Sequence, residues 1–275
     1  MRLEPCFSDV HLARRLERAE RDANARFVEA RAAVQPAVGA RWIDVNGTYA
    51  MFDGVSSPCT QTFGFGLFAL PAEGDLDAIE RFFAARGAPV FHEVSPMADP
   101  GHIAMLTGRG YQPAELSSVL YRAISTAADA GERPGPASSA VVRQVGADES
   151  HRWADTLAAG WSDVDGAGQM VGELARVMAT RPDIALFLAE MDGRAIAAGT
   201  LSICEGVALL AGASTIPPAR RRGAQSAILA ARLDYAARHG CDLAMVVAAP
   251  GSSSQRNAER NGFRIAYTRT KWLRI

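Results

Sequence analysis

Three consecutive arginines stand at the junction between an apolar segment and an amphipathic one, and a glycine follows them. The segment from Thr215 to Gln225 reads TIPPARRRGAQ. A diphosphate needs what a strand–helix junction supplies, namely unpaired backbone N–H groups and the positive end of a helix dipole. Gly223 lets the backbone approach phosphate closely, and guanidinium groups donate charge-assisted hydrogen bonds. We therefore predict a diphosphate site here. The alternative is a solvated basic turn that opens a helix.

A second polar segment follows further along the chain. Residues 250–263 read PGSSSQRNAERNGF, which predicts a short helix that ends in a Gly-Phe turn. Ser254 and Asn257 are one helical turn apart, so both could face one ligand. Ordinary capping and turn chemistry by Ser and Asn explains the same residues.

Together these two segments resemble the acetyl-CoA-binding parts of the GNAT (GCN5-related N-acetyltransferase) superfamily. The family pattern is Arg/Gln-x-x-Gly-x-Gly/Ala, often with a proline three residues before it. Arg220, Gly223 and Pro217 match this pattern, whereas Gln225 stands where Gly or Ala is usual. The resemblance covers residues 140–275 and is strongest from Val207 to Phe263.

The resemblance implies an acetyl-CoA-dependent N-acetyltransferase, in which an amine attacks the thioester directly in a ternary complex. Acetyl-CoA, or another acyl-CoA, would be the co-substrate, and backbone N–H groups of the strand at residues 211–215 would polarise its carbonyl. The coenzyme-binding residues would be Ala213, Ser214, Thr215, Arg220, Arg221, Arg222, Gly223, Ala224, Gln225, Ser226, Ser254 and Asn257.

The resemblance also points to the acceptor side and to the proton chemistry. Trp161 and Asp163 fall on the segment that often lines the family's acceptor site, where an aromatic beside a carboxylate suits a cationic amine. A buried Trp beside a solvated turn is the alternative. Many family members carry a general-acid Tyr where this chain has Ala258. Tyr267 is the nearest tyrosine and the candidate acid, although it could equally be a packed aromatic. We expect no side chain to dominate, with water relaying the amine proton.

The chain reads as two halves joined by a linker rich in Pro, Gly and small residues. We predict domains at 1–124 and 140–275, with the linker at 125–139. Short matches recur in the same order in both halves, which indicates an internal duplication. The predicted fold class is α/β (α+β): two tandem GNAT-like domains, each a mixed, mostly antiparallel sheet flanked by helices. A long helix from Ser8 to Ala33, with Ser8 as its N-cap, could pack across the domains or in a homodimer.

In the C-terminal half we predict strands at Ile184–Glu190, Arg194–Ile203, Val207–Ala213 and Leu243–Ala248, and a helix at Gln225–His239. The N-terminal half is predicted to be a degenerate copy. At the place of the arginine loop it carries Glu73 and Asp75, which would repel a diphosphate. Coenzyme binding in that half is therefore not expected.

Composition excludes other classes of function. The 275 residues carry a net charge of −1, which argues against nucleic-acid and membrane-surface partners. No apolar run could span a bilayer, and the four cysteines and five histidines show no metal-site spacing. We expect a cytoplasmic protein without a metal, acting on a small-molecule or peptide amine. A non-catalytic acyl-CoA-binding regulatory module remains the alternative. An unrelated nucleotide-binding protein is disfavoured, because no Walker lysine or early GxGxxG is present.

Overall fold

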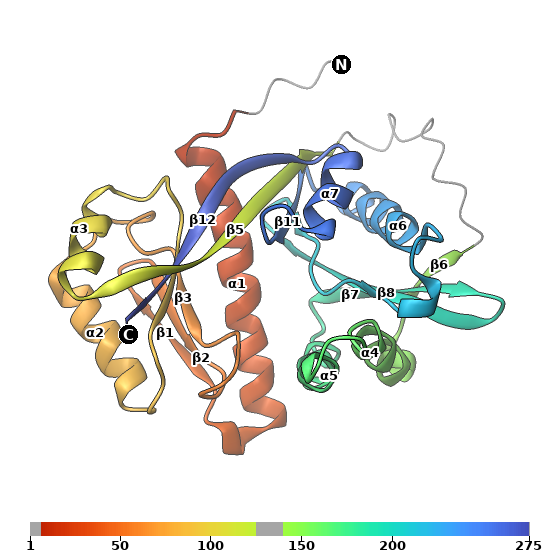
Figure 1. The fold of residues 1–275 in the computed structure, drawn as a ribbon, viewed down its shortest axis with the longest axis horizontal. Helices are drawn as coiled ribbons and strands as arrows, with labels where there is room; N and C mark the ends of the chain where they lie inside the picture. The colour runs from red at the N-terminus through yellow and green to blue at the C-terminus, as the bar shows by residue number, and fades with distance from the viewer. Residues whose placement is uncertain (1–6, 125–139, 275) are drawn as a thin grey trace. The chain divides into compact units, whose positions relative to one another are not determined.

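The computed structural model describes residues 7–124 and 140–274 (Figure 1). The predicted linker at 125–139 lies outside these described residues. The chain divides into two compact units, and each is described by itself. Unit 1 holds the described residues of 122–246, and unit 2 holds 7–121 together with 247–274.

The last segment of the chain belongs to unit 2, although the sequence analysis placed it with the C-terminal domain. This segment contains α7 (Ser253–Arg260) and β12 (Arg264–Arg274). β12 is antiparallel to β4 (Phe91–Val94) on one side and to β5 (Tyr111–Ala123) on the other. Two backbone ladders thus tie the segment to the N-terminal part of the chain.

Unit 1 is a mixed sheet with helices on both faces. β6 (Val141–Val145), β7 (Ile184–Met191), β8 (Arg194–Cys204) and β9 (Val207–Leu209) are antiparallel in that order. β11 (Leu243–Ala248) then pairs with β9 in parallel. The helices α4 (Ser150–Ala159) and α5 (Ala167–Met178) cover one face, and α6 (Ala224–Arg238) covers the other (Figure 1).

Local sequence explains how this sheet is built. The β7–β8 hairpin turns at Asp192 and Gly193, whose φ angles of 53° and 72° suit the tight turn that matches strand twist. Trp153 of α4 is fully buried, and its Nε1 donates to the Gly199 carbonyl at 3.2 Å. This single bond and its apolar ring fix α4 on the sheet.

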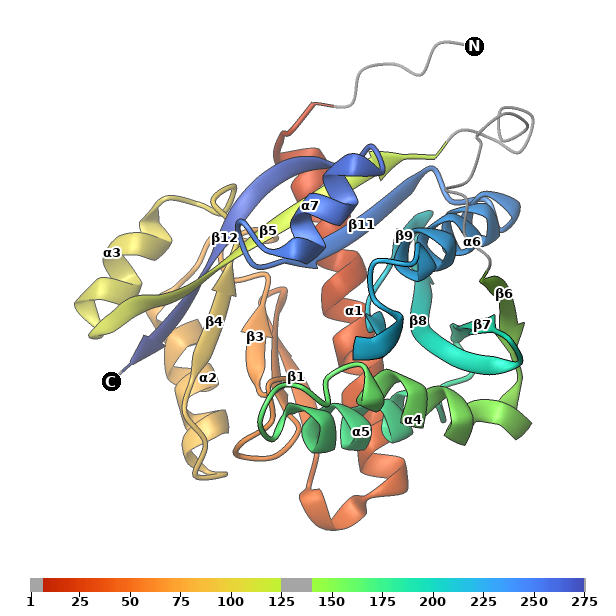
Figure 2. The same ribbon diagram turned by 45° about the vertical axis from the view of Figure 1, so that its right-hand side comes forward.

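Unit 2 also has a mostly antiparallel sheet, in the order β1-β2-β3-β4-β12-β5. The strands not yet introduced are β1 (Arg41–Val45), β2 (Thr48–Phe52) and β3 (Gln61–Phe63), and the helices are α1 (Val10–Val34), α2 (Glu73–Ala84) and α3 (Gly101–Gly108). In Figure 2, α7 lies beside β12 and β5, and Gln255 accepts a hydrogen bond from Ser118 of β5.

The N-cap of the long helix is one residue later than predicted. Asp9, not Ser8, caps α1, because its carboxylate accepts from the Leu12 N–H at 2.8 Å. A carboxylate at this position also faces the positive end of the helix dipole.

A cluster of charged side chains is buried under α1 in unit 2. Arg269 of β12 is 2% exposed and lies 2.7 Å from Glu20, 2.9 Å from Glu93 and 3.2 Å from Glu17. Tyr267 donates to Glu17 at 2.9 Å. One cation thus holds three carboxylates inside the unit.

Candidate active site

The arginine-rich loop of unit 1 lies where a strand is followed by a long helix. After β10 (Ser214–Thr215) comes a 3-10 turn at Pro217–Ala219, and α6 begins at Ala224. Gly223 has φ 82°, a left-handed conformation that glycine adopts without strain. Arg221 adopts the same region with φ 62°. The loop therefore brings its backbone around to the N-terminus of α6.

The N-terminus of α6 has no side-chain cap. Among the hydrogen bonds of the described residues, none is donated by the backbone N–H of Ala224, Gln225 or Ser226. Such N–H groups, next to left-handed residues and at the positive end of a 15-residue helix, form an anion-binding arrangement. The residues predicted to hold a diphosphate are thus arranged as that ligand requires.

The strand before the loop is not the continuous Val207–Ala213 strand that the sequence predicted. β9 ends at Leu209, and pairing with β8 resumes only at β10. From Ser202 to Ala198, β8 advances four positions, while the opposite strand advances five from Leu209 to Ser214. The extra residue is a β-bulge, and it interrupts the ladder at residues 210–213.

The two residues of β10 point to opposite faces of the sheet, as in any strand. Ser214 Oγ donates to the Leu157 carbonyl of α4 at 2.8 Å. A side chain at Gly160 would collide with Ser214, since an added Cβ would lie 2.2 Å from its Oγ. Thr215 is 6% exposed, and its Oγ1 is buried without a hydrogen-bond partner in the described structure. A buried, unused hydroxyl fits a ligand that supplies the missing partner.

Arg220 is engaged by the protein itself. Its Nη1 and Nη2 bind the Asp163 carboxylate at 2.6 and 2.8 Å, and Nη2 also donates to the Gly160 carbonyl. This contact lowers the pKa of Asp163 and raises that of Arg220. The Arg220 side chain therefore links the loop to the segment between α4 and α5. Trp161 on that segment is 42% exposed, so the buried-Trp alternative is wrong.

Residues 153–263 match the model of the acetyltransferase (GNAT) family. These residues form a GNAT-family domain. Among curated proteins, none matches the sequence.

Solved structures extend the likeness over most of the chain. A GCN5-related N-acetyltransferase from Kribbella flavida is 19% identical, with a TM-score of 0.62 over 91% of this chain and 95% of that one. A tandem GNAT protein from the clavulanic acid biosynthesis pathway is 15% identical, with a TM-score of 0.58 over 82% and 77%. At these identities the likeness shows the fold: mixed α/β, with mostly antiparallel sheet flanked by helices. The family match at residues 153–263 supports coenzyme A-dependent acyl transfer by that part of the chain.

Two of the predicted coenzyme ligands lie on α7, which the family match includes but which packs in unit 2. Ser254 is exposed and Asn257 is partly exposed. The capping role belongs to the neighbouring Ser252, whose Oγ accepts from the Gln255 N–H. The hydroxyl of Ser254 and the side-chain amide of Asn257 are therefore not needed to cap α7. Their role toward a coenzyme stays a prediction.

Tyr267, the candidate acid of the GNAT domain, also lies in unit 2. Its ring is 6% exposed, and its hydroxyl donates to Glu17. Burial, together with the nearby Glu17 charge, raises the pKa of Tyr267 well above its usual value. This placement is that of a packed aromatic with a structural hydrogen bond, which was the alternative interpretation of its sequence position.

Two further findings bear on cofactors and membranes. Within residues 7–124 and 140–274, no group of three or more His, Cys, Asp or Glu side chains is arranged to hold a metal ion. In the same residues, no helix has the length and apolarity needed to cross a membrane.

Proposed function

We propose that the GNAT domain binds acyl-CoA at the N-terminus of α6 and transfers the acyl group to an amine. This proposal rests mainly on the N-terminus of α6, where three successive N–H groups have no hydrogen-bond partner among the described residues. These groups follow a bulged strand. Helix dipole and N–H groups act together on a diphosphate. The hydroxyl of Thr215, at the end of β10, adds a further donor just before the loop.

Each part of the loop has a distinct role in this proposal. The N–H groups of Gly223, Ala224, Gln225 and Ser226 bind the diphosphate, and Arg221 and Arg222 add positive charge. Backbone N–H groups at 211–213, released from the ladder by the bulge, polarise the acyl carbonyl. Arg220 is not proposed as a phosphate ligand through its side chain, because Asp163 holds it.

The co-substrate supplies an activated thioester, so the chain needs no nucleophile of its own. The enzyme holds the amine and the acyl carbonyl in line, and orientation with carbonyl polarisation provides most of the rate acceleration. Attack of the amine breaks the carbon–sulfur bond of the thioester; solvent accepts the proton of the amine and protonates the departing coenzyme A thiolate. The exposed ring of Trp161 is the proposed contact for a cationic small-molecule or peptide amine. Asp163 is a weaker candidate, since Arg220 already neutralises it.

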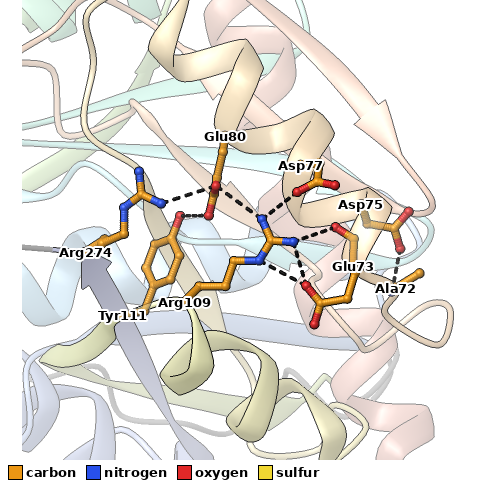
Figure 3. Close-up of polar contacts among 8 residues, drawn as sticks. All are labelled: Ala72, Glu73, Asp75, Asp77, Glu80, Arg109, Tyr111 and Arg274. Carbon is orange, nitrogen blue, oxygen red and sulfur yellow. Dashed lines mark hydrogen bonds and ion pairs between the residues drawn. The ribbon is translucent and has the colours of Figure 1, made fainter.

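The start of α2 in unit 2, which the sequence predicts to be the counterpart of the arginine loop, carries several carboxylates (Figure 3). At the start of α2, Asp75 Oδ2 accepts from the Ala72 N–H at 2.9 Å. Arg109 is surrounded by acidic side chains, 2.6 Å from Glu73, 2.6 Å from Asp77 and 3.4 Å from Glu80. The helix end is thus lined by carboxylates, which repel phosphate. We therefore propose one coenzyme site per chain.

A panel of amines incubated with acetyl-CoA and the protein tests the reaction. Mass spectrometry should reveal an acetylated amine and an equal amount of free coenzyme A. Coenzyme binding without any acetylated product across small-molecule and peptide amines would instead support a regulatory acyl-CoA-binding module.

A further inference from the structure

Arg232 of α6 is a buried cation without a buried anion beside it. The residue is 4% exposed, and none of the ion pairs in the described part of the chain includes it. Burial lowers the pKa of Arg232 to about 10, so the side chain still carries its charge at neutral pH. Its Nε has no hydrogen-bond partner among the residues that the structure describes. Burying an uncompensated charge is costly, which indicates a role beyond packing.

The contacts of Arg232 lie at the bulge. Its Nη1 donates to the Thr200 carbonyl at 2.9 Å and to the Ala211 carbonyl at 3.3 Å. The Ala211 carbonyl also accepts from Thr200 twice, from the backbone N–H at 3.2 Å and from Oγ1 at 2.9 Å. Three donors therefore hold this one carbonyl oxygen toward β8 and α6.

Fixing that oxygen fixes the N–H of the next residue. The peptide unit is planar and trans, so the Gly212 N–H points opposite to the Ala211 carbonyl, away from β8. Within the described residues this N–H has no acceptor. Gly212 has φ 52°, a conformation that favours glycine. The bulge thus presents one oriented donor at the opposite edge of the strand.

Gly199 of β8 leaves room for the Arg232 side chain. An added Cβ at Gly199 would lie 3.4 Å from the guanidinium carbon of Arg232 and 2.8 Å from Ile228. Only a glycine at this position of β8 lets both side chains of α6 reach the sheet. The contact of Arg232 with the sheet therefore depends on residues of both α6 and β8.

We propose that Arg232 is a positioning residue for acyl transfer: it holds the Ala211–Gly212 peptide so that the Gly212 N–H binds the thioester carbonyl. This inference rests on the proposed function. A cation on the carbonyl end of a peptide also strengthens the hydrogen bond that its N–H donates, because linked hydrogen bonds polarise one another. Arg232 acts through the backbone and does not touch the substrate.

The test compares acetyl-CoA with S-ethyl-coenzyme A, a thioether that lacks the carbonyl. The wild-type chain should prefer acetyl-CoA by about 2- to 13-fold in Kd, the range for one hydrogen bond. Difference infrared spectra of acetyl-CoA with a ¹³C carbonyl should show that band shift to lower frequency on binding. In Arg232→Gln and Arg232→Met both the preference and the band shift should shrink, whereas coenzyme A itself binds as before.

Two further variants keep the test sharp. Arg238→Met changes an exposed arginine on the same helix and should alter neither readout. Thr200→Val removes a second donor to the Ala211 carbonyl without changing side-chain size, and should reduce the band shift even if the Arg232 variants do not fold.

Three outcomes are decisive. An unchanged preference and an unchanged band shift in folded Arg232→Gln would overturn this inference but not the proposed function. If the Arg232 variants do not fold, an unchanged band shift in Thr200→Val would overturn it. A wild-type chain that binds neither coenzyme A nor acetyl-CoA would overturn the proposed function and this inference with it.

Discussion

Replacing Arg269 by methionine should destabilise unit 2 strongly while leaving its shape intact. The side chain is 2% exposed and faces Glu17, Glu20 and Glu93, which are 1%, 13% and 5% exposed. Methionine fills much of the space but leaves Glu17 and Glu20 without the cation that pairs with them, whereas Glu93 keeps Lys271 at 3.3 Å. Removing one partner of a buried ion pair costs about 3–5 kcal/mol. At about 2–4 °C for each kcal/mol, the Tm of unit 2 should fall by about 6–20 °C.

Calorimetry measures this Tm, and hydrogen exchange of the β12 amides follows unit 2 separately from unit 1. Arg274→Met is the matched control, because Arg274 lies on the same strand but is 49% exposed and pairs with Glu80 at 3.3 Å. That change should cost at most about 1 kcal/mol. Arg269→Met combined with Glu17→Gln should recover part of the loss. A loss in Arg269→Met no larger than in the control would refute the account of this cluster.

Three other predictions concern the site and the buried cluster. Arg222→Glu should raise the Kd for coenzyme A at least about tenfold in calorimetry, through lost attraction and new repulsion of phosphate, and an unchanged Kd in a folded variant would count against the loop. Tyr267→Phe should lower kcat by less than about tenfold, and a hundredfold loss with coenzyme affinity intact would make it the acid. Burial raises the pKa of Glu17 from 4.5 to about 7, so folding takes up a proton between these values. Stability should therefore fall as pH rises through this window. Glu17→Gln should flatten that dependence in urea unfolding at pH 5 and pH 8, and a wild-type stability that rises instead would contradict the assignment.

Patterns of apolar residues and turns predicted most elements of unit 1. The helix predicted at Gln225–His239 is α6 at Ala224–Arg238, and the strand at Leu243–Ala248 is β11. The predicted family also holds for residues 153–263. Both predictions rest on local sequence. The spacing of apolar residues reflects which face of an element is buried, and the arginine-glycine loop is one continuous segment.

What the sequence could not show depends on contacts between distant residues. The helix α6 was predicted, but not that Arg232 is one of its buried positions, beside Ala224, Ile228, Leu229 and Ala236. An arginine on an amphipathic helix is normally exposed, so the bulge contact with Ala211 had no sequence signal. Nor did any pattern reveal that Asp163 would pair with Arg220.

The pairing of β12 shows the same limit at the level of a whole segment. A strand of alternating residues at the end of a chain does not specify its neighbours, because its partners are set by tertiary packing. Here Arg269 and Tyr267 contact Glu17 of α1, although these residues are separated from Glu17 by more than two hundred positions in the sequence. The predicted boundaries at 1–124 and 140–275 therefore differ from the compact units at the C-terminal end.

Titration of coenzyme A into the full chain by calorimetry tests the proposed diphosphate site at the N-terminus of α6. We expect one site per chain. Its Kd should rise in Arg222→Glu and stay unchanged in Asp75→Lys, a charge reversal at the start of α2 in unit 2. Two equivalent sites would contradict the single-site claim. Absence of binding at millimolar coenzyme A, in a folded protein, would contradict the proposal that the N-terminus of α6 holds the diphosphate.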